Sequence, residues 1–298
     1  MMTPSYVYYT QIMQAETLAS AYRLWRRNWK GPGREYTAGA LVWQINDCWP
    51  VTSWAIVDYF LRPKPAYFSI ARELSRVTVG MTRKDQTTYA DKHTAANFVT
   101  ETKIEIWGSN FSLDEIHATL KVTAFDLDRD DGWTDGFDQE VVLKPNQTTE
   151  LWNGQLPGQP IRASKAELAK NIILSARIVA KDGTTLARYA NWCVIRHLPV
   201  RPELIRVPYR PEPFKYIVFP PVDKLGLSAT IATDGESLTL STKKPIKGIV
   251  IDVADRSGAE VKWSDQAIDL VPGDDQVVKA VGLAGREVKL RYLGDGSA

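Results

Sequence analysis

The sequence contains very little cysteine, since Cys48 and Cys193 are the only two in 298 residues. They lie in parts of the chain that we expect to form different domains, which excludes a disulfide framework and favours a reducing compartment. The first residues lack the basic and apolar regions of a signal peptide. No run of about 18 apolar residues is present that could form a transmembrane helix. We therefore expect a cytoplasmic protein with no membrane partner.

An excess of charge of one sign is also missing, because 37 Lys and Arg residues nearly balance 35 Asp and Glu residues. A net charge of +2 gives no electrostatic reason to expect nucleic acid as a partner. The three histidines, His93, His117 and His197, are scattered and have no metal-ligand spacing. Glycine-rich phosphate loops and nucleophile motifs with a nearby base are absent too. We expect neither a metal nor a cofactor.

The chain begins with a pattern typical of an amphipathic helix. Pro4 suits the first helical position, and Gly31-Pro32-Gly33 ends the pattern. A basic ridge of Arg23, Arg27 and Lys30 fits either an anionic partner or a solvated face near the helix C-terminus, where cations are favoured. We expect the solvated face. The apolar stripe, spaced by threes and fours, consists of Tyr8, Ile12, Ala15, Ala19, Tyr22, Trp25 and Trp29.

The next segment predicts a strand, a loop and a second helix. Residues 37–45 are typical of a short buried strand, and a polar and aromatic loop follows to about residue 62. Pro63-Lys64-Pro65 begins a helix, with its apolar side formed by Ala66, Tyr67, Ile70, Ala71 and Leu74. This order is a piece of an α/β architecture. A single strand has no partner for its backbone groups, so residues 1–76 are expected to form an incomplete domain.

From about residue 77 the sequence changes to alternating patterns separated by turn signals. Six or seven short strands over about 120 residues indicate an immunoglobulin-like β-sandwich at residues 77–198. A proline-rich linker follows at residues 199–224, and a small immunoglobulin-like β domain is expected at residues 225–298. The strands are predicted at residues 78–82, 98–107, 116–125, 137–143, 172–179, 187–195, 237–241 and 248–253.

The stretch from Trp43 to Asp58 is the most informative part of the sequence. It interleaves three tryptophans with two carboxamides and two carboxylates. Aromatic faces suit the apolar side of a pyranose, and planar polar groups suit its hydroxyls. If the first segment ends a (β/α)₈ barrel, this loop lies on the face where such barrels build their sites. The candidate substrate-binding residues are Trp43, Asn46, Asp47 and Trp49. Alternatively, the tryptophans fill space between domains, as we expect for Trp54.

The carboxylates of this stretch do not form a convincing catalytic pair. Retaining glycosidases need two carboxyl groups about 5 Å apart, with one protonated and one ionised. Nothing in the spacing of Asp47 and Asp58 requires that distance. We expect Asp58 to anchor the loop through hydrogen bonds. Glu35 precedes the predicted strand and would lie at the opposite end of a barrel.

Residues 35–50, 54–60 and 62–67 closely resemble the end of the barrel in β-mannosidases of glycoside hydrolase family 2, of the intracellular fungal type. The resemblance is specific over residues 5–75 and weaker beyond. It implies a fold that is mixed but mainly β: the C-terminal remnant of a (β/α)₈ TIM barrel over residues 1–76, followed by two immunoglobulin-like β-sandwich domains. It also implies hydrolysis of terminal non-reducing β-D-mannose with retention, using β-mannosides or manno-oligosaccharides and no cofactor. In that family the tryptophan matching Trp43 lines the sugar subsite.

The sequence departs from the family in its catalytic residues. The family's acid/base is a glutamate in an Asn-Glu pair, and its nucleophile is a glutamate before an aromatic residue and glycine. Neither pattern occurs in this chain, so it contains no catalytic residue. We expect the missing N-terminal barrel portion to be its partner and the chain alone to be inactive. Two alternatives remain: a non-catalytic carbohydrate-binding or interaction module, and a fragment without its own function that exposes apolar surface around residues 38–74.

Overall fold

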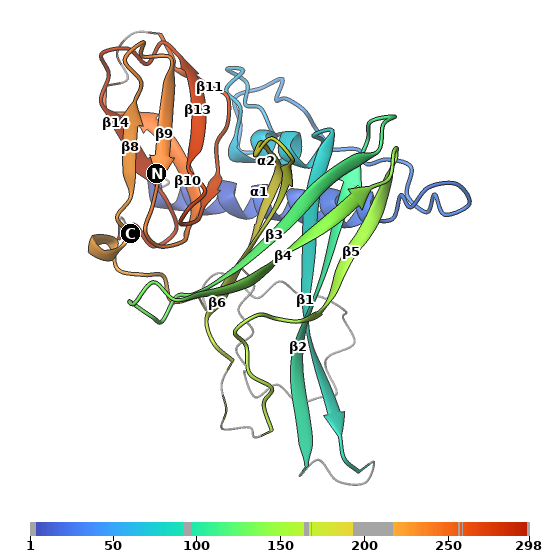
Figure 1. Ribbon diagram of the computed structural model, residues 1–298. Helices are drawn as coiled ribbons and strands as arrows, with labels where there is room; N and C mark the ends of the chain where they lie inside the picture. The colour runs from blue at the N-terminus through green and yellow to red at the C-terminus, as the bar shows by residue number, and fades with distance from the viewer. Residues whose placement is uncertain are drawn as a thin grey trace. The chain divides into compact units, whose positions relative to one another are not determined.

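The computed structural model describes residues 4–91, 97–163, 167, 169–192, 217–255, 257 and 259–296 (Figure 1). The described chain is mainly β, with two α-helices near its N-terminus and four sheets whose strands pair antiparallel. The predicted mainly β fold class is therefore confirmed. The chain forms two compact units: unit 1 consists of Met1–Thr78 and Pro220–Ala298, and unit 2 of Val79–Phe219. In the described part, no helix combines the length and the apolar character needed to cross a membrane.

Helix α1 (Pro4–Arg27) follows the predicted apolar stripe for most of its length. Tyr8, Ile12, Ala15, Ala19 and Tyr22 are all buried, as spacing by threes and fours predicts. The prediction for Trp25 is wrong, because 45% of this residue is exposed. The second helix ends at Glu73, which pairs with Arg23, and Trp25 lies beyond this pair in the last turn of α1.

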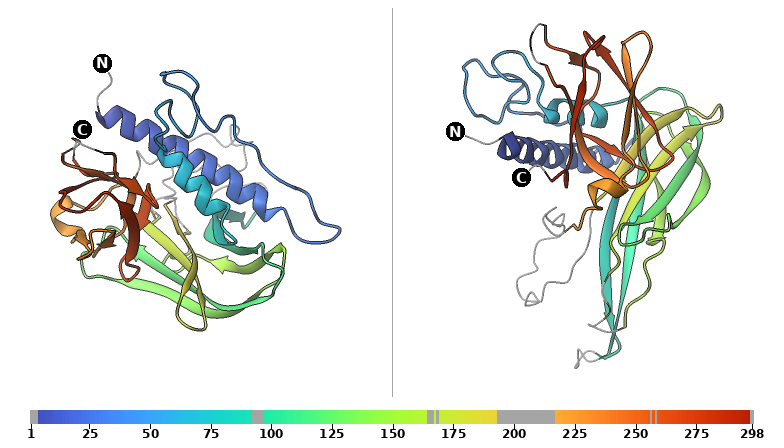
Figure 2. Two further views of the ribbon diagram at one scale, coloured as in Figure 1. Left: turned by 90° about the horizontal axis from the view of Figure 1, so that it is seen from above. Right: turned by 90° about the vertical axis from the view of Figure 1, so that its left-hand side faces the viewer.

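Helix α2 (Pro65–Glu73) starts with a proline, which needs no backbone hydrogen bond in the first turn. It lies beside α1 and runs in the same direction, since Ala15 faces Ser69 and Arg23 faces Glu73 (Figure 2). The Ser69 hydroxyl donates to the Ala15 carbonyl at 3.1 Å. Three residues expected on the apolar side, Tyr67, Ala71 and Leu74, are exposed instead. The buried residues of α2 are Pro65, Ala66, Phe68, Ser69, Ile70 and Glu73.

The basic ridge of α1 is not a uniformly solvated face, which corrects the prediction for Arg23. This residue is only 8% exposed, and its Nε donates to Glu73 Oε1 at 2.8 Å. A guanidinium on the helix surface becomes buried here because α2 places a carboxylate against it. Sequence spacing along α1 alone cannot show a partner that lies 50 residues later.

Residues 37–45 form no regular strand, so the predicted buried strand is not found. Leu41 is 98% exposed, while Ala40 and Val42 pack partly against the α1–α2 core. No strand of the described chain lies alongside these residues, so their backbone groups have no ladder to join. The end of the segment is held by backbone hydrogen bonds, in which the amides of Ile56 and Val57 donate to Gln44 O and Ile45 O.

Unit 2 contains two sheets with the strand orders β1-β2-β5 and β4-β3-β6-β7. Their facing side chains form the core, where Ile104, Ile106, Leu120 and Ile178 are completely buried. The sequence did not predict β5, because its residues Gln147–Gln155 are mostly polar; the strand pairs with β2 through eight residue pairs. The bounds are β1 Val77–Tyr89, β2 Phe98–Asn110, β3 Ile116–Asp126, β4 Thr134–Leu143, β5 Gln147–Gln155, β6 Ile172–Ala180 and β7 Thr185–Asn191.

The C-terminal strands of unit 1 form sheets with the orders β12-β10-β14 and β11-β13-β9-β8, around a shared apolar core. A short 3₁₀ helix, η3 (Val222–Lys224), precedes them, and residues 199–216 of the predicted linker lie outside the described residues. The bounds are β8 Ser228–Ile231, β9 Ser237–Ser241, β10 Ile246–Val253, β11 Lys262–Trp263, β12 Ile268–Leu270, β13 Gln276–Val281 and β14 Val288–Arg291.

These strands pack against the N-terminal helices, although the sequence predicts separate domains at residues 1–76 and 225–298. The Tyr8 hydroxyl on α1 donates to the Gly248 carbonyl on β10 at 2.8 Å. Gly248 has φ +69°, and a Cβ there would lie 3.3 Å from Ile12 Cδ1. The positive φ therefore favours glycine here, and the close approach of α1 leaves little room for a side chain.

Candidate functional site

The segment from Trp43 to Asp58, called the tryptophan loop below, presents its three tryptophans to solvent. Trp43 is 77% exposed, Trp49 68% and Trp54 64%. Trp54, which we expect to fill space between domains, is exposed in the described chain. Its neighbours Ala55 and Ile56 are buried instead, so the apolar run of the sequence is divided between surface and core.

Asp47 is the buried polar residue at the base of this exposed surface. Its Oδ1 accepts a hydrogen bond from the Ser53 hydroxyl at 2.5 Å, and its Oδ2 lies 3.6 Å from Lys64 Nζ. Ser53 Oγ also accepts from the Ala55 amide at 3.0 Å. The Asp47 carboxylate therefore holds the turn around Ser53 and connects it to Lys64, the N-cap residue of α2.

The four predicted substrate-binding residues thus fall into two groups. Trp43, Trp49 and Asn46 are exposed, while the Asp47 carboxylate is held inside the loop. Asn46 Nδ2 donates only to the neighbouring Asp47 carbonyl, at 3.2 Å, among the hydrogen bonds of the described residues. Exposed rings beside a carboxamide are suited to stacking on a sugar and to binding its hydroxyls.

Backbone hydrogen bonds give the tryptophan loop its shape. The Val57 amide donates to Ile45 O at 2.8 Å, and the Asp47 amide donates back to Val57 O at 3.1 Å. Helix α1 supports the same loop from outside, since Gln14 Nε2 donates to Trp54 O at 2.7 Å. Neither Gln14 nor Lys64 was predicted from the sequence to hold the loop. The Pro63-Lys64-Pro65 pattern at a helix start was the one signal that could have drawn attention to Lys64.

Asp58 closes the loop as predicted, through hydrogen bonds rather than as a catalytic group. Its Oδ1 accepts from the amides of Phe60 and Arg62, both at 2.9 Å, and its Oδ2 accepts from Arg62 Nε at 2.7 Å. Burial acts to raise the pKa of Asp58, but the hydrogen bonds from Arg62 and Phe60 outweigh it and lower the pKa below its ordinary value. These hydrogen bonds therefore favour the ionised form of the Asp58 carboxylate.

Many large apolar residues in and around the tryptophan loop are exposed, as the fragment hypothesis expects for residues 38–74. Soluble monomers rarely expose contiguous apolar areas above a few hundred Å² unless a partner or ligand covers them. The segment therefore has an apolar composition that a partner or ligand could cover. Besides the three tryptophans, its exposed large apolar residues are Tyr36, Leu41, Ile45, Val51, Tyr59, Phe60, Leu61, Tyr67 and Leu74.

The structure offers no alternative chemistry in the residues it describes. No group of three His, Cys, Asp or Glu residues that could hold a metal occurs among them. His117 is exposed and lies 3.0 Å from Glu115, while His93, His197 and Cys193 are outside the described residues. Cys48 is exposed in the tryptophan loop. Asp47 and Asp58 are both engaged in holding the loop, so neither carboxylate points to acid/base chemistry.

Known proteins share a domain and the fold of this chain. The family model described as Mannosidase Ig/CBM-like domain matches residues 102–194, most of unit 2. The fold of the whole chain resembles part of the β-D-mannosidase from Dictyoglomus thermophilum, with a TM-score of 0.64, 17% identity, and coverage of 98% of this chain and 30% of that one. An exo-chitosanase from Amycolatopsis orientalis is also similar, with a TM-score of 0.56, 16% identity, and coverage of 96% and 33%.

The particular relatives are β-mannosidases of the B type. The chain is 38% identical over 292 residues to β-mannosidase B of Thermothelomyces thermophilus, covering 97% of this chain and 31% of that protein. It is 36% identical to β-mannosidase B of Aspergillus niger, with the same coverage. The chain is thus homologous to the C-terminal region of β-mannosidase B, and it spans about a third of the length of these relatives. The family resemblance predicted from the sequence is confirmed.

Proposed function

We propose that this chain supplies one wall of the sugar site of a retaining β-mannosidase, which removes terminal non-reducing β-D-mannose residues. The observation that carries the proposal is the exposure of Trp43 and Trp49 beside Asn46, in a chain homologous to β-mannosidase B over 97% of its length. Rings that are 77% and 68% exposed contribute little to the core of this chain, so they are available to a substrate.

In this proposal, the tryptophan loop forms the end of the last strand of a (β/α)₈ barrel and the loop that follows it. Residues 37–45 are irregular here, and a neighbouring barrel strand would give their backbone groups the partners that strand formation needs. The exposed apolar residues around the loop would then be covered by the preceding barrel elements. Helices α1 and α2 would be helices of the outer ring.

The catalytic carboxylates in this proposal belong to the part of the relatives that this chain does not match. The chain has neither an Asn-Glu pair nor a glutamate followed by an aromatic residue and glycine. Without an acid/base and a nucleophile, the two-carboxylate mechanism cannot proceed. The role of the chain is therefore to bind and orient the sugar, with Trp43 as the stacking face and Asn46 and Trp49 beside it.

A chimera tests the proposal directly. The chain replaces the matching third of β-mannosidase B from Thermothelomyces thermophilus, and hydrolysis of 4-nitrophenyl β-D-mannoside is measured. We expect the chimera to be active and the chain alone to be inactive. Trp43→Ala in the chimera should reduce kcat/KM about 100-fold, because a stacked ring contributes a few kcal/mol. Leu113→Ala, at an equally exposed apolar residue of unit 2, is the control and should leave activity unchanged.

Two results would contradict the proposal: turnover by the chain alone, or a Trp43→Ala chimera as active as its parent. A second function, non-catalytic carbohydrate binding, rests on the match of residues 102–194 to the Mannosidase Ig/CBM-like domain. It predicts saturable binding of manno-oligosaccharides in titration calorimetry of the chain by itself. Binding that survives Trp43→Ala and Trp49→Ala would place that activity in unit 2 and separate it from the barrel site.

A further inference from the structure

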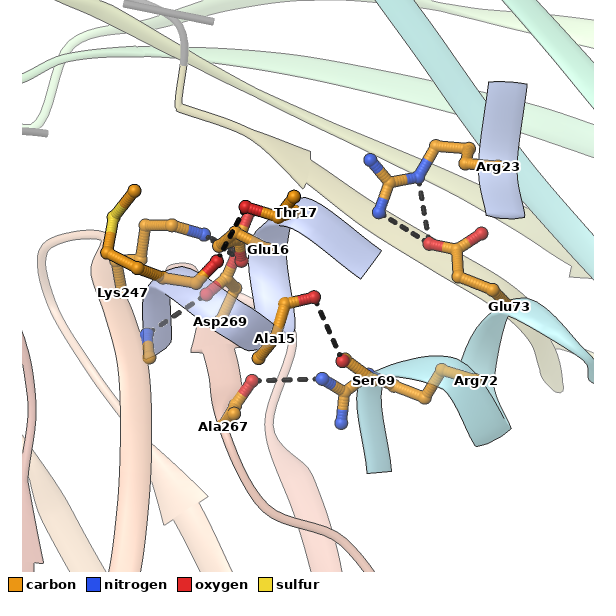
Figure 3. A network of polar contacts seen from close by, with 12 residues as sticks. Ala15, Glu16, Thr17, Arg23, Ser69, Arg72, Glu73, Lys247, Ala267 and Asp269 are labelled. Carbon is orange, nitrogen blue, oxygen red and sulfur yellow. Dashed lines mark hydrogen bonds and ion pairs between the residues drawn. The ribbon is translucent and has the colours of Figure 1, made fainter. Parts of the chain in front are cut away.

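Lys247 is a buried cation that lies between two carboxylates from different elements of unit 1. It is 1% exposed. Its Nζ donates to Glu16 Oε1 on α1 at 2.7 Å and to Asp269 Oδ2 on β12 at 2.9 Å (Figure 3). Burial acts to lower the pKa of Lys247, but Asp269 and Glu16 outweigh it and raise the pKa above its ordinary value. The ammonium group is therefore charged and paired on both sides.

A local irregularity in β10 directs Lys247 toward α1. The pairing of β10 with β12 shifts register between Ile246 and Ile249, which is where Lys247 and Gly248 lie. At this point Asp269 Oδ1 accepts a hydrogen bond from the Gly248 amide at 3.0 Å. Such irregularities commonly redirect a side chain out of the alternation of a strand. Here the result is a lysine directed at a helix 231 residues away in the sequence.

The same edge of the C-terminal strands also holds the second helix. Arg72 on α2 donates to the carbonyls of Gln266 at 2.8 Å and Ala267 at 3.0 Å, and it forms an ion pair with Asp265. Helix α2 is therefore bound to the segment between β11 and β12, and α1 is bound to the start of β10. Residues that follow the tryptophan loop by about two hundred positions fix the two helices beneath it.

A single turn of α1 contacts both Lys247 and the tryptophan loop. Gln14, two residues before Glu16, donates to the Trp54 carbonyl at 2.7 Å. Ala15, between them, is buried in one apolar cluster with Ile56 and Ile70. The ion pair on one side of α1 and the hydrogen bond on the other thus constrain the same short stretch of helix.

We propose that Lys247 is a positioning residue for the tryptophan loop, acting through Glu16 and Gln14 of α1. The C-terminal strands then have a role in the sugar site that they do not touch: they fix the position of the helix on which the loop rests. The role in sugar binding depends on the proposed function, but the mechanical link from Lys247 to the loop does not. The test therefore measures the loop without any sugar.

Hydrogen exchange followed by mass spectrometry on the whole chain tests this link. Glu16→Ala removes one carboxylate from Lys247, and Thr17→Ala is its matched control, because Thr17 is exposed and bonds only to Met13 O within α1 in the described structure. We expect Glu16→Ala to speed exchange about tenfold at residues 44–57, with Thr17→Ala without effect. Peptides from β3 and β6 in unit 2 should not change in either variant and serve as an internal reference.

Two further variants separate positioning from simple loss of structure. Glu16→Gln keeps an oxygen acceptor for Lys247 and should recover part of the protection at residues 44–57. Gln14→Leu removes the bond to Trp54 O and should speed exchange in the loop while β10 stays protected. Adding Glu16→Ala to Gln14→Leu should then have a smaller effect on the loop than Glu16→Ala alone, because the two changes act in series.

The proposal is overturned if Glu16→Ala speeds exchange in β10 while residues 44–57 keep their wild-type protection. It is also overturned if the effects of Glu16→Ala and Gln14→Leu on the loop are independent. If Glu16→Ala detaches α1 from the C-terminal strands altogether, faster exchange across residues 8–22 will show it. In that case, the effects of Glu16→Gln and Gln14→Leu on residues 44–57 decide whether the proposal holds. Because no mannoside is used, these outcomes are independent of whether the chain contributes to a β-mannosidase.

Discussion

The Arg23 guanidinium donates two hydrogen bonds to the same carboxylate oxygen of Glu73 and thereby joins α1 to α2. Both side chains are about nine-tenths buried. Burial acts to raise the pKa of Glu73, and although Arg23 opposes it, the pKa remains above its ordinary value. Such a pair contributes more to the relative position of the two helices than to net stability, because desolvation of both charges offsets much of their attraction.

Breaking this pair on one side should destabilise unit 1 strongly. We expect Arg23→Met to lower the free energy of unfolding by about 3–5 kcal/mol, because Glu73 would remain as a buried, uncompensated carboxylate. The double variant Arg23→Met, Glu73→Leu should recover most of that loss. Arg62→Met removes a half-exposed arginine from its pair with Asp58 and should cost at most about 1 kcal/mol. Urea unfolding measures all three, and equal costs for Arg23 and Arg62 would contradict the argument.

Tryptophans of the loop and of the core should respond differently to removal. Trp43 is 77% exposed, so Trp43→Ala should change the free energy of unfolding by at most about 0.5 kcal/mol. Trp107 on β2 is 1% exposed, and Trp107→Ala should cost about 3–5 kcal/mol. Thermal unfolding of the two variants makes the comparison. If Trp43→Ala strongly lowered the free energy of unfolding, the Trp43 ring would be part of what stabilises this chain and would not be available to a ligand or partner.

The anchor at Asp58 should make the tryptophan loop sensitive to acid. Its pKa in the folded state lies below the ordinary value of 3.8, so the unfolded chain takes up a proton first as the pH falls. The stabilisation is therefore present above pH 3.8 and is lost as the pH falls through the folded-state pKa.

Asp58→Asn tests this dependence. At neutral pH we expect a loss of about 1 kcal/mol, since the carboxylate is hydrogen-bonded but lies near the surface. The difference from wild type should shrink as the pH falls below 3.8. Asp138→Asn, which removes an exposed pair with Lys121, serves as the control and should have little effect at any pH. A difference that grows in acid would have the wrong sign.

Two glycines of unit 2 should differ in their tolerance of a methyl group. A Cβ at Gly136 would lie 2.0 Å from the backbone oxygen of Val122, and its φ of +156° also disfavours a side chain. A Cβ at Gly108 would meet the end of the Leu143 side chain at 2.6 Å, which can move. Gly136→Ala should therefore cost about 3 kcal/mol or more, and Gly108→Ala about 1–2 kcal/mol. Urea unfolding monitored in unit 2 measures this order, and the reverse order would contradict the packing described for β3 and β4.

Patterns that repeat locally were predictable from the sequence. The period of α1 located its buried face as far as Tyr22, and alternation located most strands of unit 2. The strand β5 was not predicted, because Gln147–Gln155 is polar and takes its conformation from β2 rather than from its own pattern. For residues 37–45 a strand was predicted but is not found. Their composition suits a buried strand, but the described chain provides no strand to pair with them.

For the candidate site, too, the sequence predicted local features but not long-range contacts. Its residue types, three tryptophans with Asn46 and Asp47, were visible in the sequence, and so was the anchoring role of Asp58. The contacts that hold the site were not visible, because Gln14, Lys64 and Lys247 reach their partners across 40, 17 and 231 residues.

By itself, then, the sequence predicted the candidate sugar-binding residues and determined which face of α1 is buried and which family the chain resembles, because all three depend on residue type and short-range spacing. Only the tertiary structure decided that the N-terminal helices and the C-terminal strands form one unit. It also decided that Arg23 and Lys247 are buried, each in an ion pair with a carboxylate, rather than solvated. The physical reason is that a charge is buried only when the fold brings an opposite charge to it, and that partner can lie anywhere along the chain.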